Sequence, residues 1–205
     1  MTGKDINTEE KILNAAKEIF MHYGLYGARM QDIADKAGIN KALLHYYFRS
    51  KEKLFDAVFD GALEKYFEQM TVFSKIELPL EERLYTYVDN MFAFLEEYPQ
   101  MTMFIIKEIS TNPVLFKEKV EGLKAEKGSL LIPTLKTAFE TGELEPFDPL
   151  IFMMNLHSLV AYPFVATPIF RAISEKSGVA YDLEVKNRVK QSVKDFIAFK
   201  LNKQA

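Results

Sequence analysis

The sequence predicts an all-α protein in which a small N-terminal domain, residues 1–50, precedes a larger helical domain, residues 51–205. Apolar residues recur at spacings of three and four along most of the chain, which is the period of an amphipathic helix. Prolines and glycines interrupt this pattern at intervals that suit helices of ordinary length. No strand-like alternation and no internal repeat competes with it.

The first 50 residues carry start and stop signals for three helices. Thr8 is the expected N-cap of the first helix, and Gly24 is its expected end. Gly38 ends the second helix, because glycine allows the positive φ of a tight turn. Asn40 is the expected N-cap of the third. The helices are therefore predicted at about residues 8–24, 30–37 and 41–48.

The larger domain begins with a long fourth helix that Ser50 caps. Beyond it, prolines separate the helical stretches, and the apolar segment near the C-terminus is expected to bend at Pro163 or Pro168. The further helices are predicted at about residues 80–98 and 101–111, with a break within 113–140, then from 150 onward, and finally at 181–201.

Composition excludes several classes of site. The chain has no cysteine, which rules out disulfides, thiolate catalysis and cysteine-ligated metals. Its three histidines are far apart, and neither a phosphate-binding glycine loop nor a metal-ligand spacing is present. We therefore expect no enzyme activity, no cofactor and no metal. The polar N-terminus lacks the apolar core of a secretory signal, so a cytoplasmic protein is expected.

One apolar segment, residues 150–173, is long enough to span a bilayer. It contains Asn155, His157, Ser158 and two prolines, which are costly in lipid without polar partners. A buried or interface helix is therefore the preferred interpretation, and no membrane association is expected.

Charge is unevenly distributed along the chain. The protein has a net charge of −3, yet residues 1–55 hold nine Lys or Arg against seven Asp or Glu. Within this part, residues 41–53 hold four basic residues against Glu52 alone. Such a patch suits phosphate binding at short range. An ordinary solvated face is the alternative interpretation of the same run.

The two short helices joined by "AGIN" form a helix-turn-helix pattern under the first helix. At about 100° per residue, Leu44, Tyr47 and Phe48 fall on one side of the third helix. The opposite side carries Ala42, His45, Tyr46 and Arg49, and Lys41 lies at its flank in the first turn. Of the four consecutive rings, two are thus expected to face inward and two outward.

The run "MQDIADKAGINKALLHYYFRSKEKLF" resembles the DNA-binding signature of the TetR family of bacterial transcriptional regulators. The resemblance implies an all-helical homodimer with an N-terminal helix-turn-helix domain and a larger domain for dimerisation and ligand binding. His45, Arg29 and Leu43 depart from the residues usual in the family. The residues expected to contact double-stranded DNA are Arg29, Lys41, Ala42, Leu43, His45, Tyr46, Arg49 and Lys51.

The larger domain holds most of the 17 Phe and nine Met residues of the chain. Such residues are usually core, although they also suit a pocket for a small apolar or aromatic effector. Candidate lining residues are Phe92, Met103, Phe104, Phe152, His157 and Tyr162. The last helices are expected to form the dimer interface, through Leu156, Val160, Val185, Val189, Val193 and Phe196.

Together these features predict a ligand-responsive regulator, with a repressor favoured, that binds a near-palindromic operator as a homodimer and is released by a small apolar effector. An architectural or activator-type DNA-binding protein without small-molecule sensing is the alternative, because a helix-turn-helix alone does not show that the larger domain senses anything.

Overall fold

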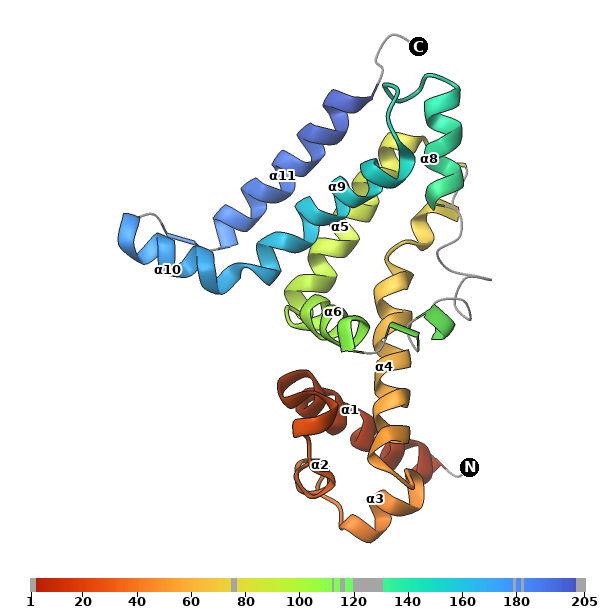
Figure 1. Cartoon of the computed structure of the whole chain (residues 1–205), viewed down its shortest axis with the longest axis vertical. Helices are drawn as coiled ribbons and strands as arrows, with labels where there is room; N and C mark the ends of the chain where they lie inside the picture. Colours follow the sequence, from red (N-terminus) through yellow and green to blue (C-terminus); the bar gives the residue numbers. More distant parts are fainter. Residues whose placement is uncertain are drawn as a thin grey trace.

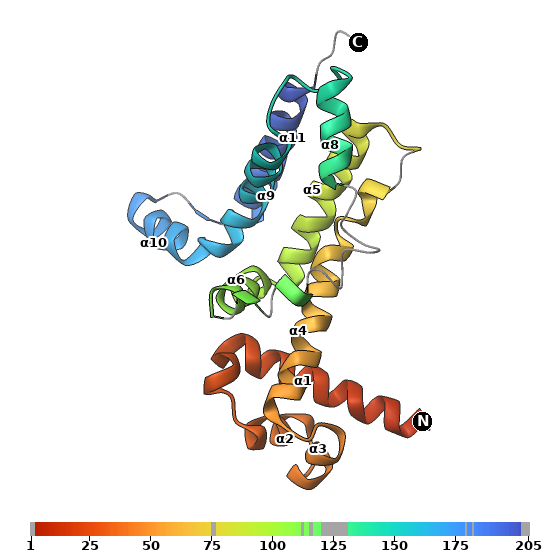
Figure 2. The same ribbon diagram turned by 45° about the vertical axis from the view of Figure 1, so that its right-hand side comes forward.

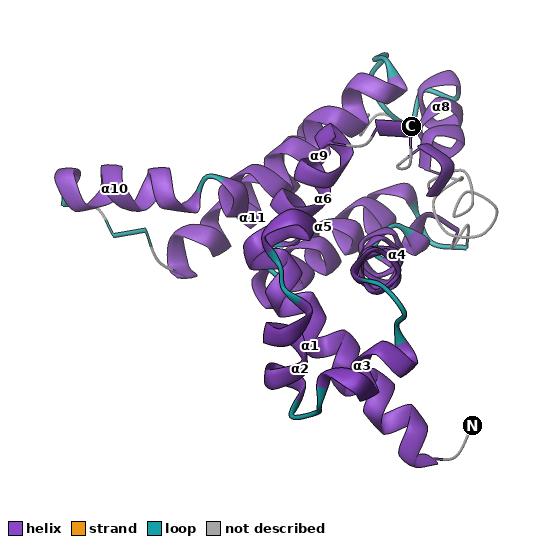
Figure 3. Ribbon diagram, turned by 60° about the horizontal axis from the view of Figure 1, so that its bottom comes forward, coloured by secondary structure: helices purple, strands orange, loops and turns teal. Residues whose placement is uncertain are grey.

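The computed structural model describes residues 3–74, 77–111, 113–114, 117–119, 131–178, 180–181 and 183–201. The regular elements in these ranges are helices, and the all-α prediction is confirmed (Figure 3). They are α1 Gly3–Gly27, α2 Met30–Ala37, α3 Lys41–Tyr47, α4 Lys51–Glu68, the 3-10 helix η1 Thr71–Ser74, α5 Leu80–Glu97, α6 Met101–Thr111, α8 Leu131–Glu140, α9 Pro149–Val165, α10 Thr167–Ser177 and α11 Leu183–Lys200.

Local sequence signals set most helix ends in the N-terminal part. Gly38 adopts φ 67° and ψ 33° after α2, and its N–H donates to the carbonyls of Ala34 and Asp35. The Asn40 side chain accepts a hydrogen bond from the Leu43 N–H at 2.8 Å. Ser50 caps α4 in the same way, through the Lys53 N–H at 3.2 Å. The predicted ends of these helices are therefore confirmed.

The prediction for the start of α1 is wrong. Thr8 lies inside the helix, which already includes Gly3, because the polar residues before Thr8 continue the helix rather than end it. Gly24 does interrupt the helix, with φ 68°, and the chain makes one more turn to Gly27. A Cβ on Gly24 would lie 2.8 Å from the Lys107 Nζ, so α6 approaches this kink closely.

The helices form two groups joined by α4 (Figures 1 and 2). Helices α1 to α3 and the start of α4 lie at one end, where Phe20 packs edge-on against Phe55 at 5.0 Å between ring centroids. Further along α4, Phe59 meets Phe104 of α6 at 5.6 Å. Helices α5, α8, α9 and α11 make up the far end, while α10 projects from it. Because α4 belongs to both groups, it is the physical connection between them.

The apolar segment forms α9 and α10, which meet at Ala166 with a bend of 64°. The sequence predicts this bend at Pro163 or Pro168, and it lies between these two prolines, at Ala166. No single helix in the described ranges is long and apolar enough to cross a membrane, and only this bent pair passes that test jointly. The predicted break within residues 113–140 falls largely on residues 120–130, outside the described part of the chain.

Candidate nucleic-acid interface

Helix α3 is anchored on one side and open on the other. Leu44 is fully buried and Phe48, its C-cap residue, is also buried. Lys41, Ala42, His45, Tyr46 and Arg49 are all exposed, with Tyr46 at 79%. The outer face of α3 is therefore free of packing against this chain.

The four consecutive rings divide as their helical positions predict. Phe48 is buried and Tyr47 is half-buried against the core. Tyr46 meets the Tyr47 ring edge-on at 5.5 Å, and its side chain is exposed. His45 is exposed. The outward pair thus presents hydrogen-bonding groups beside cations, as a phosphate-lined groove requires.

The start of α4 adds a cation to this face. Lys51 is half-buried, and its Nζ donates to the Ala28 carbonyl at 3.1 Å, across 23 positions of the chain. This bond ties the start of α4 to the link between α1 and α2 and leaves two ammonium protons for other acceptors. Sequence reasoning anticipated the lysine but not this bond, because nothing local pairs Lys51 with Ala28.

The first turn of α4 is further ordered by Glu52. The pKa of this carboxyl is lowered, because its own backbone N–H and then the Ser50 hydroxyl hydrogen-bond to it. A negative charge here is favourable at the positive end of the helix dipole.

Arg29 and Leu43 complete the predicted set. Arg29 is exposed in an extended conformation just before α2, and the Leu43 side chain is 36% exposed. Seven of the eight predicted residues are thus exposed and Lys51 is half-buried. They lie on α3, at the start of α4 and at the start of α2, which the Lys51–Ala28 bond brings together.

The six predicted pocket residues do not form one group. Phe92 packs on Phe164 at 5.4 Å, whereas Phe152 lies between Phe139 and Phe196 in another part of the bundle. Phe104 packs against the α4 rings described above. Met103 and Tyr162 are about half exposed, at 48% and 56%.

His157 instead joins two buried tyrosines. Its Nε2 lies 2.5 Å from the Tyr66 hydroxyl of α4, and its Nδ1 lies 2.8 Å from the Tyr87 hydroxyl of α5. Burial lowers the pKa of His157 and raises the pKa values of both tyrosines. All three groups are therefore neutral near pH 7, and the imidazole donates at one nitrogen and accepts at the other.

The predicted dimer residues need a correction. Leu156, Val160 and Val193 are buried inside the protomer, at 2% exposure or less, so their side chains cannot form a contact surface. Val185, Val189 and Phe196 are half-buried. The apolar pattern of these helices serves packing between α5, α9 and α11. Exposed apolar residues occur instead on the other side of α9, at Leu150, Ile151, Met154, Leu159 and Tyr162.

Comparisons with known proteins agree with this geometry. A model of bacterial regulatory proteins of the tetR family matches residues 12–58. The transcriptional regulator RutR of Escherichia coli K12 is 34% identical over 152 residues, covering 71% of this chain and 69% of RutR. The transcriptional repressor NicS of Pseudomonas putida is 26% identical over 195 residues, covering 94% of this chain and 88% of NicS.

The fold is also similar to a solved structure. The hemolysin II transcriptional regulator HlyIIR superposes with a TM-score of 0.64 at 23% identity, covering 90% of this chain and 96% of HlyIIR. Fold, helix-turn-helix and sequence similarity agree, and the chain belongs to the TetR family of bacterial transcriptional regulators, which are DNA-binding proteins and not enzymes.

Proposed function

We propose that the protein is a cytoplasmic repressor that binds a near-palindromic operator as a homodimer, through residues 1–50 and the start of α4. The observation that carries this proposal is the outer face of α3, where five predicted contact residues are exposed beside Lys51. Two such helices would enter successive major grooves about 34–36 Å apart. The name of NicS as a repressor supports the sign of regulation.

Phosphate binding by Lys51 is tested by Lys51→Ala. Each phosphate contact contributes about one unit to the slope of log affinity against log salt concentration. Lys51→Ala is expected to weaken binding to operator and to random DNA alike and to lower this slope by about one per protomer. Fluorescence anisotropy over a salt series measures both quantities. Lys176→Ala, which removes an exposed lysine from α10, is the control. An unchanged slope in Lys51→Ala would remove Lys51 from the phosphate contacts.

We further propose that residues 51–205 dimerise through the exposed apolar side of α9, since five large apolar side chains there are 41–56% exposed. Ile151→Glu places a charge in the proposed interface, and its desolvation cost is expected to weaken dimerisation by tenfold or more. Sedimentation velocity at micromolar protein measures the effect. Ile106→Glu is the matched control, because Ile106 is similarly exposed, at 46% against 48%, but lies on α6. If Ile151→Glu dimerised like the parent, the interface would lie elsewhere.

A small apolar or aromatic effector bound in the larger domain would favour a conformation in which the distance between the two α3 helices of the dimer no longer matches the spacing of the operator half-sites. Coupling of this kind is typically about 1–3 kcal/mol. Titration of the protein–operator complex with apolar compounds, followed by anisotropy, tests this step. Operator release by one of them distinguishes a sensor from an architectural DNA-binding protein.

A further inference from the structure

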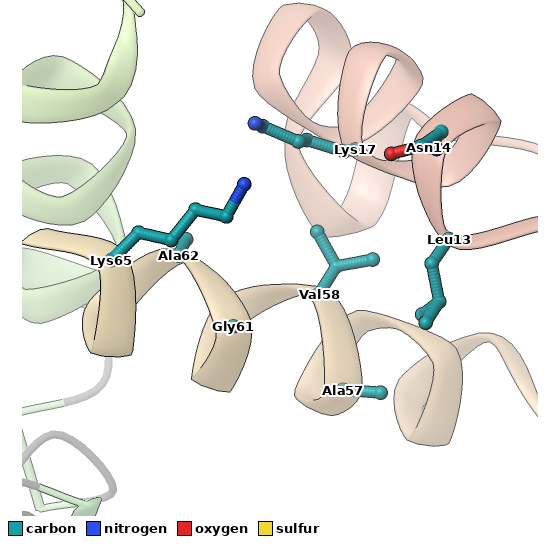
Figure 4. Close-up of a pocket in the computed structure, with 8 residues that line it drawn as sticks. All are labelled: Leu13, Asn14, Lys17, Ala57, Val58, Gly61, Ala62 and Lys65. Carbon is teal, nitrogen blue, oxygen red and sulfur yellow. The ribbon is translucent and has the colours of Figure 1, made fainter. Parts of the chain in front are cut away.

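Two lysines from different helices converge on one aromatic ring at the junction of the two helix groups. The Nζ of Lys17, on α1, lies 3.6 Å from the centre of the Tyr98 ring, and the Nζ of Lys65, on α4, lies 5.4 Å from it. Figure 4 shows the two ammonium ends pointing toward the same space between α1 and α4. Cation–π attraction holds both lysines in place, yet it also holds two like charges close together.

Neighbouring carboxylates of the described chain make no direct ion pair with these two lysines. Glu18 makes its ion pair with Lys36, at 2.7 Å. Glu97 acts on the Tyr98 hydroxyl, whose pKa it raises. Within the described ranges, neither Lys17 nor Lys65 has a carboxylate oxygen within 4.0 Å. Both ammonium groups are therefore free of a direct ion pair with the described residues.

The pKa of the Lys17 ammonium is lowered by its surroundings. Burial is the largest cause that lowers the pKa of Lys17, and the positive charge of Lys65 lowers this pKa further. The negative charges of Glu97 and Glu18 raise it. An anion between the two lysines would relieve both unfavourable effects, because it screens the repulsion and replaces lost water.

A cavity of about 130 Å³ lies beside the two lysines, between α1 and α4. Its floor is apolar, formed in part by Leu13, Val58 and Ala62, while Asn14, Lys17 and Lys65 supply its polar groups (Figure 4). A cavity of about 150 Å³ holds one benzene ring. The space thus suits a single ring or a short chain with an anionic end toward the lysines.

Gly61 is a second indication that this cavity binds a ligand. It lies in the interior of α4, where glycine destabilises a helix relative to alanine. A Cβ at this position would meet no atom within 4 Å, so close packing does not explain the glycine. Its missing side chain instead leaves room in the cavity that Gly61 lines.

We propose that this cavity binds a small organic carboxylate with an apolar body, of about the size of benzoate. The carboxylate lies between Lys17 and Lys65, and the apolar body lies on the floor against α4. A ligand there touches both α1, which packs against α2 of the helix-turn-helix, and α4, which continues into the larger domain. Occupancy therefore changes the angle between these helices and with it operator affinity. This regulatory step rests on the proposed function, whereas the binding step does not.

The binding step is tested by calorimetric titration of the full chain with sodium benzoate in the absence of DNA. We expect the parent protein to bind, with affinity lowered tenfold or more in Lys17→Met and in Lys65→Met, which lose a charge-assisted hydrogen bond. Gly61→Leu fills the cavity and is expected to abolish binding, with circular dichroism confirming that it folds. Lys11→Met, an exposed lysine change on the same helix, is expected to bind like the parent.

Two control ligands test whether binding requires both the carboxylate and the apolar ring. Benzyl alcohol keeps the ring without the charge, and inorganic phosphate keeps charge without an apolar body, so both are expected to bind more weakly than benzoate. Equal binding of either one, no binding of benzoate, or unchanged binding in both lysine variants would overturn the proposal. Operator affinity is then measured with and without benzoate. A change in operator affinity in the parent that is absent in Lys17→Met supports the coupling between benzoate binding and DNA binding. Benzoate binding without any change in operator affinity refutes this coupling but not the binding site.

Discussion

Replacing His157 by leucine is expected to lower the free energy of unfolding by about 1–3 kcal/mol for each of the two tyrosine hydroxyls that lose their partner. Tyr66 and Tyr87 are buried, at 8% and 2% exposure, so water cannot readily replace the imidazole. Urea denaturation of the parent and the variant measures the difference. Tyr87→Phe removes only one of the two hydrogen bonds and is expected to cost less.

A triple variant separates hydrogen bonding from packing. Tyr66→Phe, Tyr87→Phe and His157→Leu together remove the imidazole and both tyrosine hydroxyls, so no tyrosine hydroxyl is left unsatisfied. The triple variant is expected to be more stable than His157→Leu alone. If it were less stable, the loss in His157→Leu would come from shape and not from unpaired hydroxyls.

The same cluster predicts a pH dependence. Burial lowers the pKa of His157 in the folded state below its ordinary value of 6.5, so the unfolded state binds more protons in this window. The parent therefore loses stability as pH falls from about 6.5 toward the folded pKa, and His157→Leu lacks this contribution. The gap in unfolding free energy between the two proteins is expected to narrow between pH 7.5 and pH 5. A gap that stays constant would contradict the assigned cause.

Replacing Leu44 by alanine is the second change with a large expected effect. Leu44 is the one fully buried residue within the seven residues of α3. Truncation of a buried leucine costs about 2–5 kcal/mol. Because α3 is short, we expect local detachment of the recognition helix before the larger domain unfolds. Hydrogen exchange should show early opening of α3. Affinity for the proposed operator should fall tenfold or more, without loss of the proposed dimer.

Leu43→Ala is the matched stability control. It removes the same atoms from the neighbouring residue, whose side chain is 36% exposed on the outer face. It is expected to change stability by less than about 1 kcal/mol. Similar losses of stability in Leu43→Ala and Leu44→Ala would show that α3 is not oriented as described.

Much of the fold was predictable, because the signals that set it are local. Proline and glycine determined the ends of α2, α5 and α6, and the caps of α3 and α4 came from single polar side chains a few positions away. Thr8 shows the limit of this reasoning. A residue that can cap a helix does so only if the preceding residues leave the helix, and here they extend it.

The dimer residues show a second limit. The apolar side of an amphipathic helix predicts that something covers it, but not whether the cover is the same chain or another one. Leu156, Val160 and Val193 are covered within the protomer. In the sequence, the exposed side of α9 could not be distinguished from its buried side, because nearly the whole helix is apolar.

The sequence by itself determined that the regular elements are helices, where the turn between α2 and α3 lies, and which side of α3 faces outward. All three features depend on neighbours within four residues. The tertiary structure alone decided the partners of distant side chains. His157 meets Tyr66 and Tyr87, Lys51 meets Ala28, and Lys17 meets Lys65 over Tyr98. Each of these contacts joins different segments, and its partners are set by how whole helices pack, which no local pattern encodes.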